Sequence, residues 1–262
     1  MKRRIYSIAN QKGGVGKTTT AINLGAALAA RGLSVLIIDL DPQGNASTGL
    51  GVDRDVRQQS VYDLLLGNES ANDLARETEV DDLFIIPATM DLSSADAELL
   101  SSARRVMHLR NALRHRPADF DYILIDCPPS LNLLTVNAFV ASDSVLVPLQ
   151  AEFFALEGLS QLLLTVREVR KTANPDLRLE GVVLTMFDRR NNLSQQVEQD
   201  ARANLGDLVY ETIIPRNVRL SEAPSYAMPV LTYDPNSRGA IAYRTLAGEL
   251  LKRGTVEVMS DA

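Results

Sequence analysis

The chain has 262 residues, of which 45% are hydrophobic, and its formal net charge is −6 at pH 7. This length allows a substantial buried core, and no apolar stretch approaches the roughly 18–20 residues of a membrane-spanning helix. The acidic balance argues against a chain dedicated to nucleic-acid binding, although it is compatible with a local basic patch. One cysteine and two histidines exclude an internal disulfide, a zinc site and a histidine triad.

Short apolar runs alternate with longer runs of helical period, which predicts a single α/β domain with a mostly parallel, twisted β-sheet and helices on both faces. In chain order, strands are expected at residues 4–9, 34–39, 83–87, 122–126, 144–148, 181–186, 210–214 and 230–233. Helices are expected at 17–30, 60–65, 131–141, 158–172, 193–205 and 239–252, with a broken helical segment over 91–116. The domain is expected to span residues 1–254, with a short C-terminal tail at 255–262.

A glycine-rich loop lies between the first expected strand and the first expected helix. It reads Lys12-Gly13-Gly14-Val15-Gly16-Lys17-Thr18-Thr19. Glycines let backbone N–H groups converge on an anion, and the helix N-terminus adds a favourable dipole. Lys17 can supply charge to the β- and γ-phosphates of a nucleotide, and the Thr18 hydroxyl can ligate Mg²⁺. An ordinary tight turn is the alternative, but the strand–loop–helix setting predicts a P-loop NTPase.

Two acidic motifs follow expected strands. The segment Asp39-Leu40-Asp41-Pro42-Gln43-Gly44-Asn45 ends the second strand, and Asp126 ends the strand at 122–126. Ligands of open parallel sheets bind at the carboxyl ends of the strands. Asp41 there can order an attacking water or the metal shell, and Asp126 has the position of a Walker B carboxylate acting on Mg²⁺. A plain turn at Asp41 and a structural carboxylate at Asp126 remain the alternatives.

A further block follows the late expected strand at 210–214. It reads Pro215-Arg216-Asn217-Val218-Arg219-Leu220-Ser221-Glu222-Ala223-Pro224. An asparagine here could pair with the edge of an adenine, and a proline could pack on the base, but a surface loop is equally consistent with these residues. Met186, at the end of the preceding strand, is expected to line the same pocket. Cys127 has no histidine placed to activate it and is predicted to be a small buried residue.

Together these motifs resemble those of the ParA/Soj chromosome-partitioning ATPases of the ParA/MinD superfamily. The loop is similar to the deviant Walker A motif K-G-G-x-G-K-[ST]-[ST], and residues 39–45 are similar to the Walker A′ motif D-x-D-P-Q-G-N. The block from residue 214 resembles the family motif I-P-R-N-x-x-x-S-E-A-P, and the similarity covers roughly residues 3–253.

The resemblance implies roles for individual residues. Residues 13–19 would bind the phosphates, Lys12 would reach the nucleotide of a second subunit, and Asp41 would be required for hydrolysis. Thr18 and Asp126, with Asp41, would support the Mg²⁺ ion. Pro215 and Asn217 would contact adenine. Arg190 and Arg219 would contact DNA, with Arg189 and Arg216 as further candidates; a solvated face of mixed charge is the alternative for these arginines.

The implied activity is that of an Mg²⁺-dependent ATPase that segregates chromosomal or plasmid DNA. Its ATP-bound sandwich homodimer would bind double-stranded DNA without sequence preference, and a ParB-type partner would stimulate hydrolysis and reset it. The implied location is the cytoplasm, in association with the nucleoid and without a membrane partner. The lone cysteine fits a reducing cytosol. The first expected strand begins close to residue 1, so no helix-turn-helix extension is expected.

Three other readings share parts of this pattern. A MinD-like ATPase that cycles on the membrane during division-site placement would need a C-terminal amphipathic helix with a basic face, whereas residues 255–262 are acidic and short. An iron–sulfur reductase of the superfamily would need cysteines to ligate a cluster. A pseudo-ATPase that only binds nucleotide is disfavoured by intact Lys17, Asp41 and Asp126.

Overall fold

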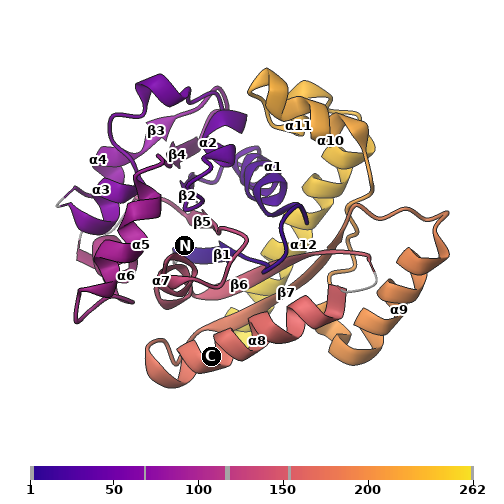
Figure 1. Cartoon of the computed structure of the whole chain (residues 1–262). Helices are drawn as coiled ribbons and strands as arrows, with labels where there is room; N and C mark the ends of the chain where they lie inside the picture. The colour runs from indigo at the N-terminus through magenta and orange to yellow at the C-terminus, as the bar shows by residue number, and fades with distance from the viewer. Residues whose placement is uncertain (1–2, 68, 116–118, 153–154, 261–262) are drawn as a thin grey trace.

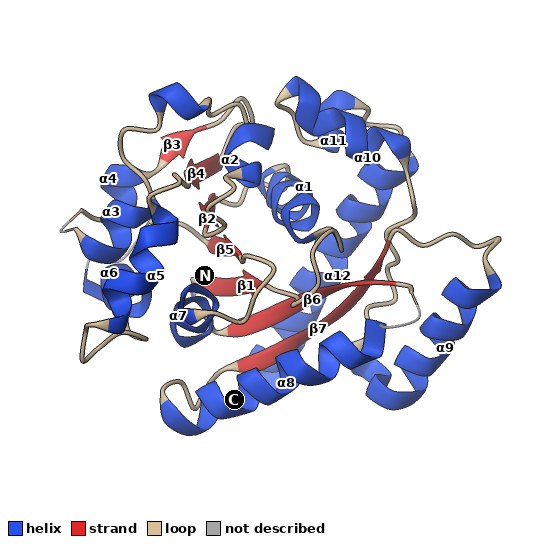
Figure 2. Ribbon diagram, in the orientation of Figure 1, coloured by secondary structure: helices blue, strands red, loops and turns tan. Residues whose placement is uncertain are grey.

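The computed structural model describes residues 3–67, 69–115, 119–152 and 155–260. One seven-stranded sheet has the order β3-β4-β2-β5-β1-β6-β7 (Figure 2). The strands are β1 (Arg4–Ile8), β2 (Val35–Asp39), β3 (Arg76–Glu77), β4 (Leu83–Ile86), β5 (Tyr122–Asp126), β6 (Ser144–Gln150) and β7 (Arg178–Thr185). Every neighbouring pair is parallel except β3 with β4. The predicted mostly parallel sheet is confirmed.

Helices cover both faces of this sheet, as the alternating pattern predicted (Figure 1). One face is covered by α1 (Lys17–Ala29), α2 (Asn45–Gly49), α10 (Val218–Glu222), α11 (Val230–Tyr233) and α12 (Arg238–Ser260). The other face is covered by α3 (Val61–Leu66), α4 (Ala71–Leu74), α5 (Leu92–Leu100), α6 (His108–His115), α7 (Leu133–Ala141), α8 (Ala155–Thr172) and α9 (Asn192–Leu205).

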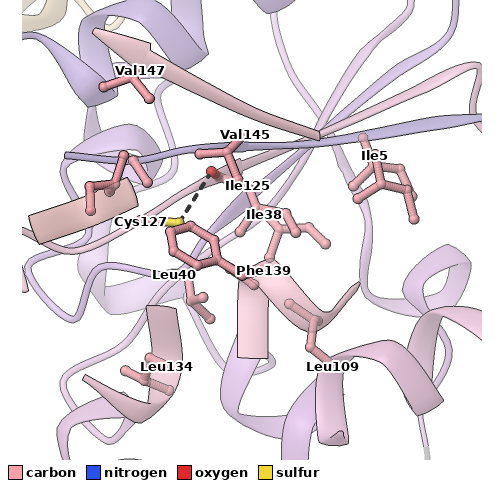
Figure 3. Packing of buried hydrophobic residues seen from close by; sticks show 14 of the residues in the cluster. Ile5, Ile38, Leu40, Leu109, Ile125, Cys127, Leu134, Phe139, Val145 and Val147 are labelled. Atoms are coloured by element: carbon pink, nitrogen blue, oxygen red, sulfur yellow. Dashed lines mark hydrogen bonds between the residues drawn. The ribbon is translucent and has the colours of Figure 1, made fainter. Parts of the chain in front are cut away.

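The two faces of the sheet bury two separate hydrophobic clusters. Alternation along β2 sends Leu36 and Ile38 into one cluster and Val35 and Ile37 into the other. This explains why the central strands read as continuous apolar runs. Figure 3 shows the cluster on the α7 side, where Cys127 lies near Phe139 with its Sγ 3.7 Å from the Ile125 carbonyl oxygen. Cys127 is 1% exposed, so its prediction as a small buried residue is confirmed.

Two of the expected strands are wrong. Residues 210–214 run beside β7 but form no strand, and the two isolated bridges, Val182 with Val209 and Phe187 with Pro215, lie on either side of them. One reason lies in α12, whose Glu249 carboxylate accepts the backbone N–H groups of Glu211 (2.8 Å) and Thr212 (2.9 Å). The Tyr210 N–H donates to Val182 of β7, so a ladder would use the Thr212 N–H next.

The segment expected as a strand at 230–233 is instead the short helix α11. Pro229 is its N-cap, and the side-chain oxygen of Asn23 on α1 accepts the N–H of Val230 at 2.7 Å. A four-residue apolar run does not distinguish a strand from one helical turn. The last helix was predicted to end at residue 252, but α12 extends to Ser260, across the expected boundary with the tail.

Candidate functional site

The glycine-rich loop joins β1 to α1 at the carboxyl edge of the sheet. Gly14 and Gly16 have φ angles of 73° and 89°, the left-handed region that favours glycine. Gly16 is the N-cap of α1 and provides no side-chain hydrogen bond to the helix. The first N–H groups of this thirteen-residue helix therefore have no side-chain cap and can receive an anion.

Lys17, the first residue of α1, is buried against this loop. It is 6% exposed, and its Nζ donates a hydrogen bond to the Lys12 carbonyl oxygen at 3.1 Å. Burial lowers the pKa of the ammonium, while the nearby groups Asp126, Cys127 and Asp41 oppose that shift. A buried cation at the N-terminus of a helix is suited to binding an anion.

Asp126 ends β5 in the middle of the sheet, in register with Ile8 of β1 and Asp39 of β2. It is fully buried, and neither carboxylate oxygen has a hydrogen-bond partner among the described residues. Burial and the neighbouring Asp39 raise the pKa of Asp126 well above its usual range, against the Thr18 hydroxyl and Lys17. A buried carboxylate with unmet lone pairs beside a threonine hydroxyl fits a divalent cation that takes its other oxygens from phosphate and water.

Asp39 and Asp41 follow one another at the end of β2 but have different surroundings. Asp39 is fully buried and accepts hydrogen bonds from the Ser47 N–H (2.8 Å) and hydroxyl (2.6 Å), and burial raises its pKa to about 6. Asp41 is 8% exposed, and the only hydrogen bond that its carboxylate accepts among the described residues is from the Gln43 N–H at 3.0 Å. Of the two, Asp41 has the carboxylate with the greater capacity left to bind water.

Lys12 lies in the same loop as Lys17 but has a different partner. Its Nζ forms an ion pair with Glu152 at 2.6 Å, and its side chain remains 43% exposed. Glu152 follows β6, and sequence reasoning missed it because a single glutamate after a strand carries no motif. The structure thus places the two lysines of the loop in separate environments, one buried and one at the surface.

The residues expected to contact adenine meet in one cavity of about 300 Å³. Met186, Pro215 and Asn217 line it together with Gly16 and Thr19 of the P-loop and α1. A hydrogen bond of 2.8 Å from the Thr185 hydroxyl to the Val15 carbonyl joins the end of β7 to the P-loop. Leu220, from the same block at 215–224, and Tyr243 of α12 also line this cavity, and no sequence signal pointed to Tyr243.

The four arginines proposed for DNA lie on two neighbouring loops. Arg189 and Arg190 follow β7, and Arg216 and Arg219 lie at the start of α10. Both principal candidates already have carboxylate partners. Arg190, with a side chain 91% exposed, is 3.2 Å from Asp188, and Arg219 is 2.8 Å from Glu222 and 3.3 Å from Asp234. Arg216 lies close enough to Asp188 to help lower the pKa of that carboxyl group, so the two loops are adjacent.

The sequence and the fold of this chain are similar to those of known proteins. Residues 3–179 match the family described as an AAA domain. The chain is 58% identical over 252 residues to chromosome partitioning protein ParA of Caulobacter vibrioides, covering 95% of this chain and 94% of that protein. It is 53% identical over 251 residues to the sporulation initiation inhibitor protein Soj of Bacillus subtilis, covering 96% and 99%. A solved structure named cobyrinic acid a,c-diamide synthase, from Mycobacterium smegmatis with bound ADP and magnesium, superposes with a TM-score of 0.84 at 40% identity, covering 97% and 96%.

The fold and the glycine-rich loop define this protein as a P-loop ATPase. With the identity and coverage of its relatives, the chain belongs to the ParA/Soj family of chromosome-partitioning ATPases. Among the described residues, no helix combines the length and apolar character needed to cross a bilayer.

Proposed function

We propose that this chain drives DNA segregation through an ATP-dependent cycle of dimer formation, DNA binding and hydrolysis stimulated by a ParB-type centromere-binding protein. The observation that carries the proposal is the separation of the two P-loop lysines. Lys17 is buried against the glycine-rich loop, whereas Lys12 is half exposed and paired with Glu152. Its exposure leaves Lys12 free to exchange Glu152 for the γ-phosphate of a second subunit by a charge-assisted hydrogen bond.

Residues 13–19 would bind the phosphates through their backbone N–H groups and through the Lys17 ammonium. Thr18 and Asp126, with Asp41 beside them, would hold Mg²⁺, which when bound neutralises phosphate charge. The unmet lone pairs of Asp126 support this assignment. Met186, Pro215 and Asn217 would receive the adenine, and the Thr185–Val15 hydrogen bond keeps that pocket in register with the phosphate loop.

Hydrolysis is assigned to Asp41, which would orient the attacking water while Lys17 stabilises the developing phosphate charge. Its low exposure and free lone pairs support this role. Asp41→Ala should leave ATP binding and dimer formation intact while reducing turnover, so that the ATP-bound dimer accumulates. The check is phosphate release measured beside light scattering; normal turnover by this variant would refute the assignment.

DNA binding is assigned to Arg190 and Arg219, with contributions from Arg189 and Arg216. Each subunit offers only a few cations, so a dimer would gain affinity by presenting two sets at once. Contacts to phosphates make binding independent of sequence and steeply dependent on salt. Such a dimer would associate with the nucleoid and leave it upon hydrolysis.

The test is fluorescence anisotropy of a labelled random-sequence duplex with ATP, ADP or no nucleotide at low and moderate salt. We expect binding only with ATP, and a marked loss in Arg190→Ala and Arg219→Ala. Arg170→Ala is the matched control, because Arg170 is an exposed arginine at the end of α8 that leads into β7, whereas Arg189 and Arg190 follow the opposite end of that strand. Pelleting with anionic liposomes runs in parallel, and liposome binding without DNA binding would instead establish the MinD-like function.

A further inference from the structure

A buried arginine, Arg57, forms hydrogen bonds with the loop that follows Asp41. Arg57 is 8% exposed and follows the 3₁₀ turn Arg54–Val56. Its Nη2 donates to the Thr48 hydroxyl (2.8 Å), the Val52 carbonyl (2.8 Å) and the Gly44 carbonyl (3.4 Å). Its Nε donates to Val52 (3.1 Å), and its Nη1 donates to the Ala88 carbonyl at 3.1 Å. One side chain therefore holds three points of the segment after Asp41 and one point beyond β4.

All of these acceptors are uncharged oxygens. In the part of the chain that the structure describes, Arg57 forms no ion pair, and burial lowers the pKa of its guanidinium while Asp39 opposes that shift. Burying a cation without a contacting carboxylate is costly, so an uncharged side chain would be the more stable choice if the site had only to be filled. The planar guanidinium of Arg57 carries several donors in a fixed arrangement, which suits a position that must bind several backbone carbonyls at once.

A second set of contacts reaches the same point beyond β4. The Ser47 hydroxyl donates to the Asp39 carboxylate (2.6 Å) and accepts from the Ala88 N–H (3.0 Å). Ala88 is thus held through its N–H by Ser47 and through its carbonyl by Arg57. The segment from Asp41 to Val52 is tied to the end of β4 by both contacts.

Gly44 shows how closely the guanidinium approaches this segment. Its φ angle is 65°, and a Cβ at this position would collide with Nη1 of Arg57. The Gly44 N–H in turn donates to the Asp41 carbonyl at 2.9 Å, which closes the turn that follows Asp41. The contact chain from Arg57 to the backbone of Asp41 therefore passes through one residue.

We propose that Arg57 is a positioning residue for ATP hydrolysis, which sets the Asp41 carboxylate relative to the P-loop by anchoring Gly44, Thr48 and Val52 to Ala88. The proposal rests on the hydrolytic role proposed above for Asp41. A displacement of about 1 Å in a group that orients a nucleophile can lower a rate by about a hundredfold. Nucleotide binding depends on residues 13–19 and on the adenine cavity, none of which Arg57 contacts.

The test compares Arg57→Met and Arg57→Lys with the wild-type chain in steady-state ATP hydrolysis and in binding of a fluorescent ATP analogue. We expect kcat to fall at least tenfold in Arg57→Met and less in Arg57→Lys, with the nucleotide Kd changing less than twofold. Thr48→Val removes a single acceptor and should give a smaller loss of the same kind, which keeps the proposal testable if Arg57→Met does not fold.

Two comparisons separate positioning from a general structural role. Arg31→Met is the matched control, since Arg31 also donates to two backbone carbonyls, those of Ala27 (3.0 Å) and Arg244 (2.7 Å), beyond the C-terminal end of α1, whose other end carries the P-loop. It should lower the unfolding temperature without lowering kcat. In the Asp41→Ala background, Arg57→Met should cause little further loss of rate.

Equal losses from Arg57→Met with and without Asp41, or parallel losses in kcat and nucleotide affinity, would overturn the proposal. An Asp41→Ala variant of normal turnover would instead refute the role of Asp41 itself, so the two failures are distinguishable.

Discussion

The nucleotide site and the arginine loops are built in opposite ways. Asp39 and Asp126 are buried at the ends of adjacent strands, where the register of β2 with β5 fixes their relation. Arg190 is exposed on the loop after β7 and Arg219 is exposed in the first turn of α10, and each is already paired with a local carboxylate. The sheet fixes the positions of the acidic side chains before any ligand binds, whereas the DNA binding proposed for these arginines would have to compete with ion pairs inside the chain.

The largest effect is expected when the buried cation of the nucleotide site, Lys17, is removed. Lys17→Ala should lower kcat/KM for ATP by at least about a hundredfold, because a charge fixed in a site that excludes water stabilises phosphate far more than a solvated charge does. Measurement of phosphate release and nucleotide affinity checks this. Lys252→Ala, an exposed lysine on α12, is the control and should leave both unchanged.

The next effect concerns the stability of the same buried region. The pKa of Asp39 is raised from 3.8 to about 6, so the folded state binds this proton more tightly than the unfolded chain. Its contribution to stability is present below about pH 4 and is lost as the pH rises to about 6, by up to roughly 3 kcal/mol.

Urea unfolding of the nucleotide-free protein across this pH window tests the linkage. Asp39→Asn should flatten the decline between pH 4 and 6 and should gain stability relative to the wild type at pH 7. An unchanged slope in Asp39→Asn would show that Asp39 does not carry the pH dependence.

A smaller effect is expected at the half-exposed lysine. Glu152→Gln removes the partner of Lys12, and exposed ion pairs contribute about 0.2–1 kcal/mol, so ATP-dependent dimerisation should strengthen by up to about fivefold for each of the two Lys12 contacts of the dimer. Sedimentation with a non-hydrolysable ATP analogue measures this. Lys12→Ala should abolish the dimer. A Glu152→Gln variant that dimerises more weakly would contradict the idea that Glu152 competes with the γ-phosphate for Lys12.

The smallest effect is expected at the exposed arginines proposed to bind DNA. Asp188→Asn releases Arg190 from its ion pair and removes a negative charge beside Arg216, so DNA affinity with ATP should rise by about two- to fivefold at low salt. The salt dependence of binding should steepen slightly. An affinity that falls would mean that Asp188 holds Arg190 in its DNA-binding position.

Sequence reasoning succeeded where a local pattern decides the structure. The buried strands, the P-loop and the strand-end carboxylates all follow from apolar runs, glycines and acids at fixed offsets. It failed where a distant side chain decides, as at residues 211–212, whose N–H groups are taken by Glu249 on α12. Glu152, Arg57 and Tyr243 were missed for the same reason, because each acts through a contact distant in sequence or lacking any motif.

The single cysteine of the chain has a practical consequence for experiments on this protein. Thiol-directed dyes react with the thiolate, and Cys127 is buried while its pKa is raised by burial and by Asp126. The native thiol should therefore remain unlabelled under conditions that modify a surface cysteine within minutes. A reporter introduced on an exposed loop then gives a single-site fluorescent protein without any change to the strand that ends at Asp126.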